Sequence, residues 1–481
     1  MDNRHVIPSA ASRREFLHRA GNGFGAIALA ALGMEQSMRA ASSSNPLAPK
    51  VAHHAARAKH VIFLFMQGGP SQMDLFDYKP HLAEFAGKPF ELPANYEAPG
   101  LNKTKLMGPI SSFRHYGQSG LYMSEWFPML GNVADDLCVL RAMQTDTEAH
   151  ATAVRQINTG APVQVRPSMG AWIVYGLGTE NANMPGFITI RPSLTGDGGS
   201  PQNFGSAFLP AIYQGTPVGL AKSEEAAAID YSRNEKFSPG LQGHQLEILR
   251  ALNQKFLAQT PDPAMEGMIE SFELAFRMQS QAPGLMDLSK ESKETQTLYG
   301  IDDKETRDLG QQCLLARRLV EAGVRFVQVN DSGWDHHVSI RESLPKKCRQ
   351  VDKPIAALIS DLKARGLLDE TLVIWGGEFG RTPFDQDLSL GKAPEENRGR
   401  EHNPRGFTMW LAGGGVKRGL VYGETDDFAF QGVDGKVHIH DLHATILHLL
   451  GLNHESLTYR YSGRDFRLTD IYGRVVTEIL A

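Results

Sequence analysis

Cysteine is scarce in this chain of 481 residues, which contains three cysteines, Cys138, Cys313 and Cys348. Three widely spaced cysteines can form neither a disulfide scaffold nor a cysteine-based zinc knuckle. The chain also lacks an excess of positive charge, because 49 Lys and Arg stand against 54 Asp and Glu. Without a basic field to hold a polyanion, we expect no nucleic-acid partner. What is present, 41% hydrophobic and 21% charged residues, is the balance of a globular protein.

The first forty residues have the pattern of an export signal. Arg13 and Arg14 precede a weakly apolar run over residues 23–32, which is typical of twin-arginine signal peptides. At roughly ten residues, the run is too short for a stable membrane span. We therefore predict a signal peptide over 1–41 that engages the twin-arginine translocase, a linker over 42–58, and a mature protein in the periplasm or outside the cell. An amphipathic N-terminal helix is the alternative interpretation.

Residues 59–481 have the pattern of one large α/β domain. Four short and continuously apolar segments suit strands buried on both faces of a parallel sheet: 60–66, 324–330, 371–376 and 407–411. Apolar stripes at helical spacing occur at 309–320, 351–362 and 442–450. This alternation predicts a three-layer α/β/α fold with a mostly parallel sheet. Residues 190–300, rich in Gly, Pro, Gln and Ser, are interpreted as an irregular insertion or cap.

Polar side chains stand next to the expected strands, where open α/β sheets bind ligands. They include carboxylates and imidazoles: Asp74, Asp335, His336, His337, Glu378 and His402. Mixed oxygen and nitrogen ligands suit zinc, manganese or iron, whereas an all-oxygen set would indicate calcium or magnesium. Structural alternatives stay open, with Asp74 as a helix cap and Glu378 as the ion-pair partner of Arg381. The alternative for His402 is an ordinary histidine whose side chain is solvated.

A polar segment at 145–150 brings hydroxyl, carboxylate and imidazole groups together ahead of an expected helix. Thr147 would cap that helix, expected over 148–157, and His150 would lie in its first turn. The free N–H groups of a helix N-terminus also form an anion site. A phosphate or sulfate ester bound there would face metals held at the strand ends. His440, His443 and His448, in contrast, lie within an amphipathic segment and fit capping or packing.

Five segments of the chain resemble a known family: 68–71, 166–168, 333–335, 377–383 and 441–447. Over nearly its whole length the chain is similar to the exported bacterial proteins called domain of unknown function 1501. Those proteins in turn are similar to the alkaline phosphatase/sulfatase superfamily. The resemblance implies an alkaline-phosphatase-like α/β fold. It also implies one or two divalent metal ions, zinc first, with manganese or iron as alternatives.

The superfamily pattern also implies which residues hold the metals. Asp335, His337 and His402 match the ligands of the first metal. Glu378 and Asp74 are the carboxylates that remain for the second metal.

The expected nucleophile position departs from the superfamily pattern. In the superfamily pattern the nucleophile, a Ser, Thr or Cys, stands at a fixed distance before a Thr-Gly pair. The corresponding position before Thr159-Gly160 in this chain is His150. We expect His150 to act as a metal ligand and metal-activated water to attack the ester. His150 as a covalent nucleophile ranks second, and Thr147 or Thr145 ranks third.

We therefore expect an exported, metal-dependent hydrolase of a small-molecule or glycan ester of phosphate or sulfate. Arg381 is expected among the catalytic groups, because a guanidinium fork matches phosphate or sulfate oxygens. Arg405 and Ser71 are expected at the substrate. A non-catalytic binding or assembly protein on the same scaffold is the alternative. A phosphomutase-like transferase is the third possibility.

Overall fold

The computed structural model describes residues 46–90, 105–194, 196, 198–219, 238–259, 263–386 and 394–481. The expected signal peptide lies outside these residues. The described part of the expected linker is not a free spacer, because Leu47 is buried and the N–H of Arg57 donates to the Leu449 carbonyl at 2.8 Å. That segment therefore belongs to the folded body. Within the described ranges, no helix combines the length and apolar character needed to cross a membrane.

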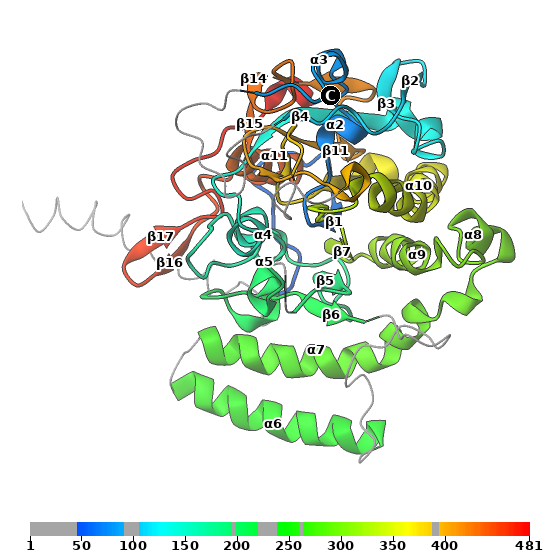
Figure 1. Cartoon of the computed structure of the whole chain (residues 1–481). Coiled ribbons are helices and arrows are strands. Elements are labelled where there is room, and N and C mark those ends of the chain that lie inside the picture. Colours follow the sequence, from blue (N-terminus) through cyan, green and yellow to red (C-terminus); the bar gives the residue numbers. More distant parts are fainter. Residues whose placement is uncertain are drawn as a thin grey trace, which may run out of the picture.

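In the described part of the chain, the central sheet has nine strands, and its middle strands are parallel. This sheet lies at the centre of Figure 1. β1 (His60–Gln67) lies between β7 (Phe326–Ser332) and β8 (Thr371–Gly376) and runs parallel to both. Every residue of β1 and β8 is buried, as expected of apolar strands covered on both faces. The predicted α/β class with a mostly parallel sheet is confirmed.

The sheet extends on both sides of these three strands. Beyond β7 come β5 (Phe187–Ile190) and β6 (Thr216–Val218), both parallel. Beyond β8 come antiparallel β11 (Phe407–Ala412) and then β4 (Leu137–Gln144), which also pairs with β12 (Leu420–Tyr422) and β15 (Val437–His438).

The reversed direction of β11 brings distant chain segments to one edge of the sheet. β4 is antiparallel to β11 and so has the same direction as β8. The chain that follows Gln144 therefore leaves from the carboxyl edge of the parallel strands. The chain that precedes Phe407 arrives at that same edge.

Helices cover both faces of the sheet. α9 (Arg307–Glu321) and α10 (Ile340–Ala364) lie on one face, and α4 (His150–Thr159), α5 (Met169–Leu177) and α11 (Ile439–Leu449) lie on the other (Figure 1). Smaller elements complete the described fold: α2 (Gln72–Leu75), α3 (Pro80–Glu84), α8 (Lys293–Leu298), β2 (Phe113–Tyr116), β3 (Leu121–Ser124), β9 (Gly380–Arg381), β10 (His402–Asn403), β13 (Glu424–Thr425), β14 (Gly432–Asp434), β16 (Tyr459–Tyr461) and β17 (Arg464–Phe466).

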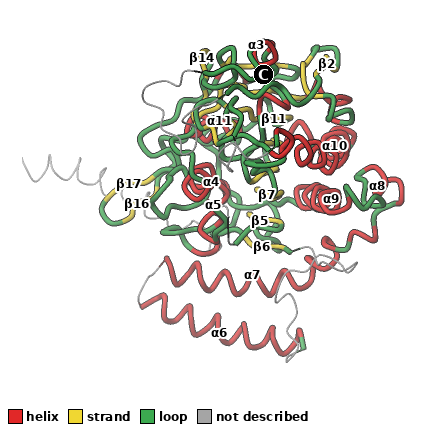
Figure 2. The backbone as a smooth tube through the Cα atoms, viewed as in Figure 1, coloured by secondary structure: helices red, strands yellow, loops and turns green. Residues whose placement is uncertain are grey.

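Residues 239–286 are regular, which corrects the prediction of an irregular insertion there. α6 (Pro239–Gln259) and α7 (Pro263–Met286) form a pair of long helices beside the β6 edge of the sheet (Figure 2). Composition misled because two of the prolines stand at the first position of a helix, where proline is tolerated. Pro239 and Pro263 begin the two helices, and Pro283 lies in the last turn of α7.

Candidate metal centre

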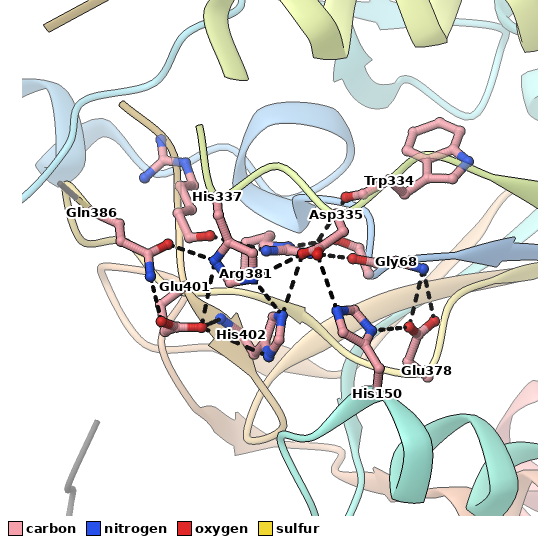
Figure 3. A network of polar contacts seen from close by, with 12 residues as sticks. Gly68, His150, Trp334, Asp335, His337, Glu378, Arg381, Gln386, Glu401 and His402 are labelled. Atoms are coloured by element: carbon pink, nitrogen blue, oxygen red, sulfur yellow. Dashed lines mark hydrogen bonds and ion pairs between the residues drawn. The ribbon is translucent and has the colours of Figure 1, made fainter. Parts of the chain in front are cut away.

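Four side chains converge at the carboxyl edge of the sheet (Figure 3). His150, Asp335, His337 and His402 each offer one ligand atom, and these atoms lie within 4.8 Å of one another. His150 is the first residue of α4, and His402 begins β10. Asp335 and His337 lie in the loop that follows β7. Three segments far apart in the sequence thus meet at one point.

Asp335 is the shared partner of the three histidines. Its Oδ1 lies 3.0 Å from His337 Nε2 and 3.3 Å from His402 Nε2, and its Oδ2 lies 3.3 Å from His150 Nε2. The two nitrogens His337 Nε2 and His402 Nε2 are 2.9 Å apart. Two imidazole lone pairs at that distance repel each other unless a proton or a cation lies between them.

The hydrogen bond of each Nδ1 atom sets the tautomer of the three histidines. Each Nδ1 lies 2.7 Å from an acceptor: Glu378 Oε1 for His150, Gln386 Oε1 for His337, and the Glu148 carbonyl oxygen for His402. A proton on each Nδ1 satisfies all three acceptors and leaves every Nε2 with a lone pair directed at the centre. Metal-binding histidines in proteins are held in this way.

The donor set fits a divalent transition metal. Three imidazole nitrogens and one carboxylate are ligands that zinc and its neighbours accept. His150 Nε2 is buried and makes no hydrogen bond in the described part of the chain, which is the state of a ligand atom. The four side chains are 13–27% exposed. The centre is therefore reachable from solvent, unlike a closed structural zinc site.

The charges around the centre favour a cation. Burial opposes ionisation of Asp335, but the histidines and Arg381 outweigh it and hold the pKa of that carboxyl well below its usual range. Burial also acts to lower the pKa of His150, but Asp335 and Glu378 outweigh burial and raise that pKa to about 9. A proton on His150 thus balances the two carboxylates, and a metal ion at Nε2 is positioned to replace it.

Arg381 supports Asp335 instead of facing a substrate, which corrects its predicted contact with an anion. Its side chain is fully buried, and its Nη2 lies 2.6 Å from Asp335 Oδ1. Its Nε donates to the Gly69 carbonyl at 2.9 Å and its Nη1 to the Arg400 carbonyl at 3.0 Å. Because protein acceptors occupy the guanidinium, Arg381 positions Asp335.

Asp74 and Ser71 belong to a separate buried ion pair, which corrects their predicted roles in metal and substrate binding. Arg400 Nε lies 2.8 Å from Asp74 Oδ2, and both side chains are fully buried. Ser71 Oγ donates to Asp74 Oδ2 at 2.6 Å, and the N–H of Ile110 donates to Oδ1 at 3.1 Å. From the short helix α2, the Asp74 carboxylate therefore pairs with Arg400.

Glu378 does not itself converge on the centre, but contacts His150, which does. Its two oxygens accept the N–H of Gly68 at 3.0 and 3.1 Å, and Oε1 also accepts Nδ1 of His150. The structure therefore places Glu378 as the partner of a ligand, where the sequence predicted a ligand.

Thr147 does not cap α4 as expected, whereas the predicted contact of Arg405 with a substrate stays a prediction. The N-cap of α4 is Ala149, while Thr147 Oγ1 lies 2.7 Å from Thr152 Oγ1. The guanidinium of Arg405 lies 5.9 Å from the centroid of the Phe430 ring.

Sequence reasoning missed Gly68, Gln386 and Glu401. Gly68 has φ +120°, and a Cβ there would stand 2.4 Å from the backbone nitrogen of Asp335. The glycine pair after the first strand was an available signal for such close approach. Glu401 Oε1 accepts the N–H of His402 at 2.9 Å, and the amide of Gln386 donates to Glu401. Neither of these two follows a strand of the central sheet, so their spacing gave no signal.

Together the fold and the centre define an α/β protein with a three-histidine, one-aspartate candidate metal centre at the sheet edge. The chain belongs to the family described as protein of unknown function (DUF1501), whose pattern matches residues 58–480. The predicted family membership is confirmed.

Several solved structures are similar to this chain. The PsFucS1 sulfatase from Pseudoalteromonas sp. is 12% identical with a TM-score of 0.37, over 88% of this chain and 72% of that chain. The lipoteichoic acid synthase LtaP from Listeria monocytogenes is 10% identical with a TM-score of 0.35, over 88% and 78%. The alkaline phosphatase from the Antarctic bacterium TAB5 is 10% identical with a TM-score of 0.34, over 83% and 99%. Among curated proteins, none matches the chain.

Proposed function

We propose that the protein is a metal-dependent hydrolase of phosphate or sulfate esters. The observation that carries the proposal is the convergence of three histidine Nε2 atoms on Asp335, with each Nδ1 held by its own acceptor. A zinc, manganese or iron ion bound there would lower the pKa of water and polarise an ester oxygen. The partial exposure of the four side chains supports a catalytic site over a purely structural one.

The chain's own residues have distinct tasks in this proposal. His150, His337, His402 and Asp335 hold the ion. Glu378 orients His150, and Arg381 fixes Asp335 while offsetting its charge. The ring of Phe379 lies 4.9 Å from that of His150 and 4.4 Å from that of His402, so it forms an apolar wall that limits water beside the centre.

The test begins with metal content and proceeds to turnover. Purified protein is expected to contain zinc, manganese or iron by elemental analysis, and Asp335→Asn is expected to lose it while remaining folded. Wild-type protein should then hydrolyse 4-nitrophenyl phosphate or 4-nitrophenyl sulfate, and Asp335→Asn should not. Bound metal without turnover of any ester would contradict the hydrolase.

One observation favours a second candidate, a non-catalytic metal-binding protein. Arg381, the buried guanidinium closest to the centre, is occupied by protein acceptors. The turnover assay decides between the two functions.

We also propose that the chain is exported by the twin-arginine route to the periplasm or beyond. The proposal rests on Arg13 and Arg14 ahead of the apolar run. Replacing both arginines by lysine should retain the protein in the cytoplasm, as measured by cell fractionation, and unchanged export would contradict the proposal.

A further inference from the structure

The two carboxylates that a second metal ion would need both have other partners. Asp74 and Glu378 are the acidic side chains that the superfamily pattern leaves for such an ion, and both are fully buried. Among the described residues, the structure offers one group of at least three ligand atoms close enough to share an ion. Neither of the two carboxylates belongs to that group.

The carboxylate of Asp74 has its full number of hydrogen-bond donors. Its Oδ2 accepts Ser71 Oγ at 2.6 Å and Arg400 Nε at 2.8 Å. Its Oδ1 accepts the N–H of Ile110 at 3.1 Å and Arg400 Nη2 at 3.2 Å. An ionised carboxylate has about four lone-pair sites, and these four donors fill them. A metal ion could bind Asp74 only by displacing at least one donor.

The guanidinium of Arg400 is equally saturated. Its Nε and Nη2 donate to Asp74. The remaining N–H groups donate to three carbonyl oxygens: Met107 at 3.2 Å, Thr382 at 3.5 Å and Gly108 at 3.0 Å. All five donors of this side chain therefore have an acceptor. A divalent ion at Asp74 would have to displace this guanidinium or lie against its positive charge.

Glu378 is occupied in a different way. Its two oxygens accept the N–H of Gly68 at 3.0 and 3.1 Å, and Oε1 also accepts Nδ1 of His150 at 2.7 Å (Figure 3). An ion at Oε1 would displace the hydrogen bond that directs Nε2 of His150 toward the centre. Glu378 could therefore join a second site only by weakening the first.

Arg400 is joined to the candidate metal centre through the backbone. Arg381 Nη1 donates to the Arg400 carbonyl at 3.0 Å, and Arg381 Nη2 lies 2.6 Å from Asp335 Oδ1. The N–H of Arg400 donates to the carbonyl of His336, the residue after Asp335, at 3.0 Å. A buried cation that belongs to the chain thus lies next to the segment that carries Asp335.

We propose that the centre holds a single divalent ion, and that the Arg400 guanidinium supplies at Asp74 the positive charge that a second ion would bring. This inference rests on the proposed function, because it takes the four converging residues as metal ligands. It also narrows the chemistry. Two ions roughly 3.5–4 Å apart can clamp both the attacking and the leaving oxygen of an ester, whereas one ion cannot. Contact with the other oxygen then falls to a side chain or to water.

The test counts the ions that one chain binds. Chelator-treated protein is titrated separately with zinc and with manganese by calorimetry, and its metal content is measured by elemental analysis after gel filtration. One ion per chain is expected with either metal. The electron paramagnetic resonance spectrum of the manganese-loaded protein should be that of an isolated ion, because two ions roughly 3.5–4 Å apart would couple magnetically.

Substitutions separate the residues that hold the ion from those that do not. Asp335→Asn should bind none. Asp74→Asn combined with Arg400→Met removes the charge of both partners of the buried pair and should still bind one ion. Glu378→Gln should also bind one ion at saturating metal, although more weakly, and serves if the double variant does not fold. In a two-ion centre, each of the last two proteins would fall from two ions to one.

The outcomes distinguish this inference from the proposed function. Two ions per chain, or a magnetically coupled manganese spectrum, would overturn the single-ion assignment, and ester turnover by that protein would leave the hydrolase standing. Absence of any bound ion would overturn both. One ion without turnover of any ester would refute the hydrolase and leave the single-ion assignment intact.

Discussion

In the proposed metal centre, we expect the side chains that contact the four converging residues to set the metal affinity. Glu378 is fully buried and accepts hydrogen bonds from both His150 and Gly68. Glu378→Gln keeps the shape but removes the charge that makes Nδ1 of His150 a firm donor. We expect metal affinity, measured by competition with a chelator, to fall roughly 10- to 100-fold.

Glu370→Gln is the matched control for that variant. Glu370 pairs with Lys59 at the surface and is 49% exposed, so its replacement should leave metal affinity unchanged. Equal affinity in Glu378→Gln and wild type would show that Glu378 does not support His150.

A substitution at Asp74 distinguishes a structural role of this residue from a role as a metal ligand. Asp74→Asn leaves Arg400 buried without its countercharge, which should reduce the free energy of unfolding by roughly 3–5 kcal/mol. Metal content per folded molecule should stay at the wild-type value. Adding Arg400→Met should recover part of the lost stability, as measured by urea unfolding. Loss of metal from a stably folded Asp74→Asn protein would restore Asp74 as a ligand.

Among individual side chains, the sequence could predict the residues that converge at the centre but not the side chains that support them. Asp335, His337 and His402 stood out because strand ends gather ligands and their side chains suit metals. Asp74 stood out for the same reason, yet the position of Arg400 across 326 residues decided its role. Gln386 and Glu401 lie on irregular segments, where no periodicity fixes the direction of a side chain.

Among the elements, α4 carries His150 and is itself held at its other end by α11. His443 Nε2 donates to the Ile157 carbonyl and His440 Nε2 to the Gly160 carbonyl, each at 2.8 Å. Burial, with a smaller contribution from His440, lowers the pKa of His443 to about 3. The imidazole of His443 is therefore neutral in the folded protein at ordinary pH.

This depressed pKa predicts how stability depends on pH. The unfolded chain takes up a proton near pH 6.5 and the folded chain only near pH 3, so the contribution of the neutral His443 to the free energy of unfolding is fully present above pH 6.5 and is lost as pH falls toward 3. Between pH 6.5 and 5 wild type should lose about 2 kcal/mol more than His443→Gln. Urea unfolding at both pH values measures the difference. An equal decrease in the free energy of unfolding of the two proteins would contradict a buried, neutral His443.

The outermost helix, α6, presents apolar side chains to solvent. Leu241, Ile248, Leu249 and Leu252 are 50–63% exposed. Because little of their surface is removed from water on folding, Ile248→Gln with Leu252→Gln should change the free energy of unfolding by less than about 0.5 kcal/mol per site. Leu314→Gln, at a fully buried position of α9, should instead prevent stable folding. A large loss in the α6 variant would mean that its apolar face is covered.

The elements with strong apolar periodicity were predictable, and those governed by distant packing were not. β1, β7, β8 and β11 follow from continuous apolar runs. The order of the strands, and the reversed direction of β11 that delivers His402 to the site, follow from no local pattern. α6 and α7 were missed because overall composition was weighted above helical spacing.

The candidate centre joins three chain segments that lie far apart in the sequence, around His150, Asp335 and His402. A metal that binds the folded state alone stabilises it by about 4 kcal/mol when its free concentration is a thousand times its dissociation constant. Chelator treatment should therefore lower the Tm of wild type by several degrees and leave that of Asp335→Asn unchanged. Scanning calorimetry with and without added zinc measures the shift. An identical response of both proteins would place metal binding elsewhere.

The order of the ligands along the chain has a consequence for biosynthesis. Ribosomes deliver His150 first, Asp335 and His337 much later, and His402 last. A growing chain that has not yet released residue 402 offers the metal an incomplete set of donors. In the proposed metal-binding protein the donor set is complete only after residue 402 has emerged from the ribosome, so we expect metal capture to follow synthesis of that residue and the docking of β11 on the sheet.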